Sequence, residues 1–171
     1  NLIPFYPSTF LVVGGKTMVV KKFLVILFLS LLYATISFAD FSPDGKQLVF
    51  SADLNGRSHI FISDSDGQNA KRISRESGNY YNPVWSPRGD MIAFEKTEGG
   101  YHYIGVMELD GSGERMIAKG YYVEDPAWTP DGLHLIYYKT RKPKNDGSDG
   151  EVNLFIVSLT GYTDIQLIPT P

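Results

Sequence analysis

The sequence predicts an all-β protein: a partial β-propeller of about three four-stranded blades, preceded by a helical signal peptide. Three copies of one short motif lead to this prediction. They are Phe41-Ser-Pro-Asp-Gly45, Trp85-Ser-Pro-Arg-Gly89 and Trp128-Thr-Pro-Asp-Gly132, and their first residues are separated by 44 and 43 positions. A fixed period in the forties is typical of propeller blades. A plain β-sandwich would give similar strand signals but not the repeated motif.

Each unit is expected to begin with a strand, a tight turn and a second strand. In the motif, proline presets φ for the second turn position, and glycine accepts the left-handed conformation that follows. Apolar residues seven and nine positions after the motif aromatic indicate the second strand. These residues are Leu48, Phe50, Ile92, Phe94, Leu135 and Tyr137.

A third apolar run and a second glycine turn follow in each unit. The third strands are expected at 59–62, 103–107 and 153–157, and the fourth at 71–74, 114–118 and 164–168. The third unit is seven residues longer in a polar loop at 141–150, and repeat arrays tolerate loop insertions. The predicted blades are about 40–76, 79–119 and 122–169, within one propeller region at 40–171.

The composition limits the possible chemistry. A net charge of −3 over 171 residues argues against a nucleic-acid surface, and the absence of cysteine excludes disulfides and thiolate catalysis. No Gly-x-Ser-x-Gly motif occurs, and the three histidines fall on separate expected strands. Asp64 to Gly67 resembles part of a calcium loop, but isoleucines occupy the first and last ligand positions. We therefore expect no catalytic residue, no metal and no cofactor.

The amino-terminal region has the pattern of a secretory signal over residues 18–39. Met18 is followed by two lysines, an apolar stretch at 23–33, and Ser37-Phe38-Ala39. The apolar stretch is shorter than the roughly 20 residues of a membrane span. Cleavage is expected between Ala39 and Asp40, which would place the product in the periplasm. Residues 1–17 are interpreted as an upstream or non-native segment; if they are translated, an uncleaved anchor is the alternative.

Secretion conflicts with a complete first blade. The second and third units begin their first strands with 82–85 and 125–128, and the corresponding segment of the first unit is 38–41. Cleavage after Ala39 would leave only Asp40 and Phe41 of that strand. The simplest inference is that a longer ancestor lost an internal segment.

Polar and aromatic residues recur at the beginning of the first strands. In a propeller, these strand ends and the loops between second and third strands lie on the same rim. Exposed aromatics with polar neighbours favour protein recognition. The candidate partner surface consists of Tyr80, Tyr81, Asn82, Tyr121, Tyr122 and Glu124. The alternative is that these tyrosines pack between blades.

Several segments resemble the carboxy-terminal blades of the TolB family, of the alphaproteobacterial type. They are residues 80–90, 104–107, 110–115, 120–121, 160–162 and 169–171. The resemblance covers about 40–171 and implies non-catalytic recognition in the periplasm, with the peptidoglycan-associated lipoprotein Pal as partner. It implies a role in outer-membrane integrity and in envelope constriction at division. The family's amino-terminal α/β domain, which contacts TolA, has no counterpart here, so no contact with TolA is expected.

Two other interpretations stay open at this point. The same motif occurs in propellers of serine peptidases, where it would belong to a domain that gates substrate access, and a decayed gene fragment is the third possibility. An open arc of three blades would also leave two apolar faces bare, without polar caps. The chain is therefore expected to self-associate, to pair with another arc or to be degraded.

Overall fold

The computed structural model describes residues 12–13, 16–17, 39–140, 151–160 and 163–167. The chain divides into two units, residues 1–32 and 33–171. In the first unit, β1 (Val12–Val13) pairs antiparallel with β2 (Lys16–Thr17). The predicted signal helix, the loop at 141–150 and the turn at Gly161 lie outside the described residues.

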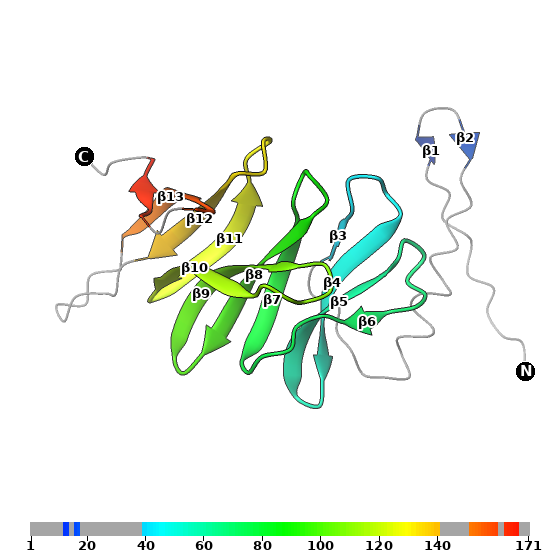
Figure 1. Ribbon diagram of the computed structural model, residues 1–171, viewed down its shortest axis with the longest axis horizontal. Coiled ribbons are helices and arrows are strands. Elements are labelled where there is room, and N and C mark those ends of the chain that lie inside the picture. Colours follow the sequence, from blue (N-terminus) through cyan, green and yellow to red (C-terminus); the bar gives the residue numbers. More distant parts are fainter. Residues whose placement is uncertain (1–11, 14–15, 18–38, 141–150, 161–162, 168–171) are drawn as a thin grey trace, which may run out of the picture. The chain divides into compact units, whose positions relative to one another are not determined.

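The second unit contains three four-stranded antiparallel sheets, which confirms the predicted partial propeller (Figure 1). The first sheet consists of β3 (Ala39–Phe41), β4 (Gln47–Leu54), β5 (Arg57–Asp64) and β6 (Lys71–Arg72). The second consists of β7 (Asn79–Trp85), β8 (Met91–Glu98), β9 (Tyr101–Glu108) and β10 (Arg115–Gly120). The third consists of β11 (Tyr122–Trp128), β12 (His134–Thr140), β13 (Val152–Ser158) and β14 (Ile165–Gln166). We call these sheets blades 1, 2 and 3.

The repeated motif forms the turn between the first and second strands of every blade. Gly45, Gly89 and Gly132 have φ values of 70°, 72° and 68°. Each donates its N–H to the carbonyl oxygen three residues earlier, at 2.8, 2.9 and 2.8 Å. The glycine is needed because a side chain is disfavoured at this φ.

The core consists of two clusters, one on each side of blade 2. The cluster shared with blade 1 includes Ile60, Ile92 and Phe94, and the cluster shared with blade 3 includes Ala93 and Leu135. Ile92, Ala93 and Phe94 are consecutive residues of β8, so their side chains alternate between the two faces of the sheet. All three are fully buried. Blade 2 is therefore covered on both faces.

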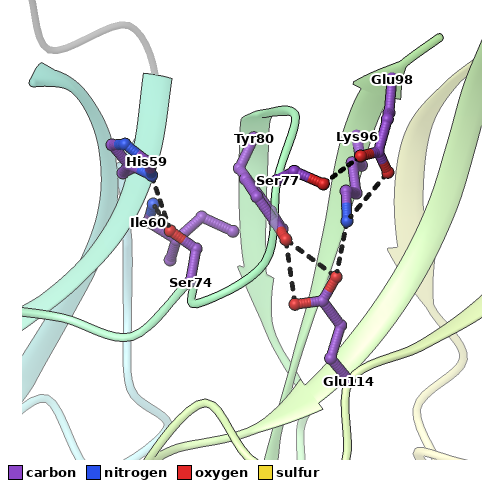
Figure 2. Close-up of polar contacts among 8 residues, drawn as sticks. All are labelled: His59, Ile60, Ser74, Ser77, Tyr80, Lys96, Glu98 and Glu114. Carbon is purple, nitrogen blue, oxygen red and sulfur yellow. Dashed lines mark hydrogen bonds and ion pairs between the residues drawn. The ribbon is translucent and has the colours of Figure 1, made fainter. Parts of the chain in front are cut away.

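The fourth strand of blade 1 is shorter than the sequence predicted, whereas β10 of blade 2 extends to Gly120, beyond the predicted end at residue 118. In blade 1 the prediction extended to Ser74, but β6 ends at Arg72. The hydroxyl oxygen of Ser74 accepts the N–H of Ile60 at 3.1 Å, and its own N–H points back to the Ile60 carbonyl oxygen at 3.4 Å. A side chain thus replaces the backbone acceptor that would have continued the ladder. Figure 2 shows this Ser74 contact beside His59, whose Nδ1 lies 3.2 Å from the same hydroxyl.

The first strand of blade 1 includes the predicted cleavage site. Ala39, Asp40 and Phe41 pair with Phe50, Val49 and Leu48 of β4. Cleavage before Asp40 would remove one of the three paired residues and leave the other two.

Candidate functional site

A buried polar cluster joins the strands of blade 2. The carboxylate of Glu114, at the turn before β10, accepts the Tyr80 hydroxyl at 2.8 Å and the Lys96 ammonium at 3.0 Å. The Lys96 and Glu114 side chains are 6% and 9% exposed. Figure 2 shows Tyr80 and Lys96 converging on Glu114, with Glu98 on the other side of the ammonium at 3.5 Å. Burial and the Glu114 carboxylate raise the pKa of Tyr80 far above its usual range, so the hydroxyl stays protonated and donates.

Blade 3 repeats this cluster with one exchange. Asp164 accepts the Lys139 ammonium at 2.6 Å and the Tyr137 hydroxyl at 2.8 Å. Lys139 and Lys96 both lie eleven positions after a motif tryptophan. The hydroxyl, however, comes from the second strand in blade 3 and from the first strand in blade 2.

Neighbouring positions compensate for this exchange. Blade 2 has Phe94 at the Tyr137 position, and its ring contacts Tyr80 with centroids 5.4 Å apart. Blade 3 has Val123 at the Tyr80 position. Blade 1 has Ala52 and Ala70 where blades 2 and 3 have the lysine and the carboxylate. The lysine and the acid recur visibly in the sequence, although the repeat motif alone did not single them out. Because the hydroxyls, ammonium groups and carboxylates of these clusters contact one another within their own blades, we assign the clusters to stability.

A second polar contact links blade 2 to blade 3. One carboxylate oxygen of Glu95 accepts the Asn82 side-chain amide at 2.6 Å and the backbone N–H of Asp125 at 2.7 Å. Asn82 and Asp125 both precede proline, both have left-handed φ (45° and 54°), and both lie within β-bulges. Asparagine and aspartate tolerate this conformation better than most residues. Glu95 thus bridges the bulges of two adjacent blades, a role that sequence reasoning did not find.

This bridge predicts a pH dependence of stability. Burial raises the pKa of Glu95 above its ordinary value of 4.5. The folded state therefore holds this proton to a higher pH than the unfolded state. The contribution of Glu95 to the free energy of unfolding therefore falls as the pH rises above 4.5. Urea unfolding of the wild type and Glu95→Gln should show that the wild type loses stability relative to the variant over this range.

The control for this experiment has the opposite sign. The Thr129 hydroxyl hydrogen bond lowers the pKa of Asp131. Relative to Asp131→Asn, the wild type should therefore gain stability as the pH rises from the acid side. The stability difference between wild type and variant should change with pH in opposite directions for Glu95→Gln and Asp131→Asn. A change in the same direction for both would contradict the role of Glu95.

The structure separates the six predicted recognition residues. Tyr80 is 0% exposed between blades, so its placement on a partner surface was wrong and the packing alternative holds for it. Asn82 is half-buried and engaged by Glu95, and Tyr81 is half-buried. The other three, Tyr121, Tyr122 and Glu124, are exposed.

Two of these residues belong to a group of aromatic residues at this end of blades 2 and 3 that sequence patterns did not reveal. Tyr121 and Tyr122 lie edge to face with centroids 4.8 Å apart, and His102 packs on Tyr122 at 4.6 Å. On the opposite face of β9, at the same end of the strand, the Lys119 ammonium lies 3.6 Å from the centre of the exposed Tyr101 ring. We call these five residues the tyrosine rim. Rigid aromatic rings with polar tips and an adjacent cation are suited to binding a protein surface.

Stacked four-stranded blades with an aromatic-Ser/Thr-Pro turn motif define a β-propeller protein. Residues 34–170 match the family described as the TolB beta propeller domain. The chain belongs to this family. No helix among the described residues is long and apolar enough to cross a membrane.

Curated relatives share substantial identity with part of the chain. A Tol-Pal system protein TolB of Gluconobacter oxydans is 39% identical over an alignment of 178 positions, and the match covers 77% of this chain and 39% of that protein. The protein of the same name in Wolbachia pipientis wMel is 41% identical over 101 residues, covering 59% of this chain and 22% of that protein. This chain therefore spans less than half the length of these relatives.

Solved structures are similar in fold. A putative TolB from Agrobacterium tumefaciens superposes with a TM-score of 0.64 at 24% identity, over 75% of this chain and 47% of that one. The β-propeller domain of the trilobed protease from Pyrococcus furiosus gives 0.60 at 16% identity, over 79% and 43%. At these identities the likeness concerns the fold alone.

Proposed function

We propose that the chain is a non-catalytic protein-recognition module of the Tol–Pal system, acting in the periplasm. The observation that carries this proposal is the 39% to 41% identity to relatives named Tol-Pal system protein TolB. In this role it would bind the lipoprotein Pal and support outer-membrane integrity and envelope constriction at division. Contact with TolA is not part of the proposal.

The chemistry of the described residues favours recognition over catalysis. The tyrosines and lysines of the two polar clusters are committed to carboxylates within their own blades. The tyrosine rim, in contrast, offers exposed rings, a lysine and the neighbouring Glu124. A partner would bury these rings while its polar groups meet their hydroxyls.

The rival candidate is the propeller of a serine peptidase. Its support is an acylaminoacyl peptidase from Pyrococcus horikoshii, with a TM-score of 0.62 at 14% identity over 78% of this chain. That likeness concerns the fold, whereas the TolB relatives share much higher sequence identity. A hydrolase domain encoded in the same reading frame would favour the rival.

Binding to Pal tests the proposal at named residues. Tyr121→Ala with Tyr122→Ala should weaken binding of Pal from the same genome at least about tenfold, because these changes remove exposed aromatic contact area. The matched control is Leu133→Ala, which removes a similarly exposed apolar side chain at the motif turn of blade 3. The measurement is a titration monitored by calorimetry or interferometry. Equal affinities of the wild type, the double variant and the control would show that the tyrosine rim does not bind Pal. If the wild type itself did not bind, Pal would not be the partner.

We also propose that residues 18–39 are removed as a secretory signal, so that the product begins at Asp40. The motif aromatic and the turn of blade 1 follow this position and would be kept. Mass spectrometry of the digested periplasmic fraction should detect a peptide that begins at Asp40. Because the digesting protease does not cut after Ala39, this end would come from signal cleavage. A product that retains residues 23–33 would contradict the proposal.

A further inference from the structure

The outer face of blade 3 is an apolar surface that no other part of the described chain covers. Its side chains come from alternate positions of β12, β13 and β14, and cross-strand pairs such as Ile136–Ile156 and Tyr138–Leu154 place them on one side of the sheet. The residues are Ile136, Tyr138, Val152, Leu154, Ile156, Ile165 and Leu167. All are half-buried or exposed, and we call them the open face.

The same repeat positions are buried in the other two blades. Eight residues after the motif aromatic, blade 1 has Val49 and blade 2 has Ala93, and both are fully buried against the next blade. Ile136 occupies this position in blade 3 and is only half-buried. The open face is therefore built to receive the surface that blades 2 and 3 present to the blade before them.

Blade 1 presents that surface on its outer side. In blades 2 and 3 it contains Phe94 and Tyr137, nine residues after the motif aromatic. In blade 1 the corresponding residue is Phe50, which is stacked on the half-buried Phe61 with centroids 5.6 Å apart. Phe50 itself is buried, so Phe61, Leu48 and Phe41 form the accessible part of this surface.

Contacts along the inner strands define how one blade meets the next. The Trp85 backbone N–H donates to the Asp40 carboxylate at 3.0 Å, and the Trp128 indole N–H donates to the Val84 carbonyl oxygen at 3.1 Å. In both cases the motif tryptophan of one blade donates to the blade before it. The acceptor belongs to the residue just ahead of that blade's own motif aromatic. Within the described part of the chain, two positions lack such a neighbour. Phe41 is 56% exposed, against 5% for Trp85, and Ala127 is exposed.

We propose that two copies of this chain close a ring, with the open face of each copy against the outer side of blade 1 of the other. Phe41 of one copy would then lie beside Ala127 of the second. The arc covers 43% of the solved β-propeller domain of the trilobed protease, so two arcs supply about the amount of structure in one propeller. A head-to-tail contact forms a closed ring only if the rotation closes; otherwise it forms a filament.

The number of interfaces also favours a ring over a single contact. A stable protein interface buries at least about 1,000 Å² in total. A dimer joined through one pair of blade faces forms a single interface, whereas the closed ring forms two equivalent ones. The ring also leaves no apolar blade face bare. The proposal does not depend on Pal binding, since it concerns the blade faces and not the tyrosine rim.

Cross-linking between engineered cysteines tests this arrangement directly, because the chain has no cysteine of its own. The full chain is expressed with one of two single substitutions, Phe41→Cys or Ala127→Cys, and the product of each is purified. A short bis-maleimide should cross-link a mixture of the two variants and neither variant alone. Cross-linking of Ala127→Cys alone would indicate blade 3 against blade 3 and would overturn the proposal.

Solution mass and surface variants complete the test. Analytical ultracentrifugation should give twice the mass of one chain for the wild type. Tyr138→Glu with Ile165→Glu, both exposed on the open face, should shift the product to monomer, whereas the control Leu133→Glu should stay dimeric. A monomeric wild type, or species that grow beyond the dimer with concentration, would overturn the closed ring. Circular dichroism of each variant verifies that the blades remain folded.

Discussion

Lys96→Met is expected to lower the free energy of unfolding by about 3–5 kcal/mol, the usual cost of removing one partner of a buried ion pair. The ammonium lies 3.0 Å from Glu114, and both side chains are almost fully buried. Its removal leaves the Glu114 carboxylate buried with the Tyr80 hydroxyl as its remaining side-chain donor in the cluster. Urea unfolding followed by circular dichroism measures the change.

A surface ion pair in blade 1 provides the matched control for this prediction. Lys46 lies 3.2 Å from Asp44, but these side chains are 81% and 57% exposed. Exposed pairs contribute about 0–1 kcal/mol, so Lys46→Met should change stability by no more than that. The double variant Lys96→Met with Glu114→Leu should recover part of the loss, because no charge is then left buried. Similar small effects for Lys96 and Lys46 would show that the blade 2 cluster is solvated.

Gly111→Ala should be the most damaging glycine-to-alanine change among the residues that the structure describes. Gly111 forms the second turn of blade 2 with φ of 83°, and an added Cβ would lie 1.9 Å from the carbonyl oxygen of Ile73, in the segment after β6. That distance is far inside van der Waals contact, so the backbones of the two segments must separate. We expect a loss of several kcal/mol, combining left-handed strain with overpacking.

Gly45→Ala separates these two costs. Gly45 has a similar φ of 70°, but an added Cβ there would have no atom within 4 Å. Its substitution should therefore cost only the conformational term, about 1–2 kcal/mol. Thermal unfolding of both variants gives the comparison. A Gly111→Ala variant as stable as Gly45→Ala would mean that the turn of blade 2 does not pack on the Ile73 backbone.

The repeat made the fold predictable from sequence. The motif gives the turn, and the residues seven and nine positions later give the buried face of the second strand, so Ile92 and Phe94 could be assigned to the core from their spacing alone. The end of the fourth strand in blade 1 could not be assigned in the same way, because the Ser74 hydroxyl takes the place of a backbone acceptor. The β-propensity of the residues does not reveal that a side-chain oxygen will replace a backbone carbonyl as the hydrogen-bond acceptor.

The candidate site was predicted only in part, because burial depends on neighbouring blades. Tyr80 and Tyr122 occur in similar paired tyrosines, yet Tyr80 points to a buried carboxylate and Tyr122 lies on the surface. Tyr80 lies five positions before its motif tryptophan and Tyr122 lies six positions before its own, so their side chains fall on opposite faces of the first strand. Lys119 and Tyr101 could not be paired from sequence, since β9 and β10 bring them together only after folding.

Blades that stack face to face, with blade 2 enclosed by the other two, are the basis of both the fold and the proposed ring. Native-state hydrogen exchange on the Tyr138→Glu, Ile165→Glu variant, which is expected to be monomeric, tests this stacking most directly, because exchange is slowest where the structure is most stable. We predict that the backbone amides of β8 and β9 exchange more slowly than those of β4, β5, β12 and β13. Equal protection in all three blades, or the slowest exchange in blade 1 or blade 3, would contradict the stacking.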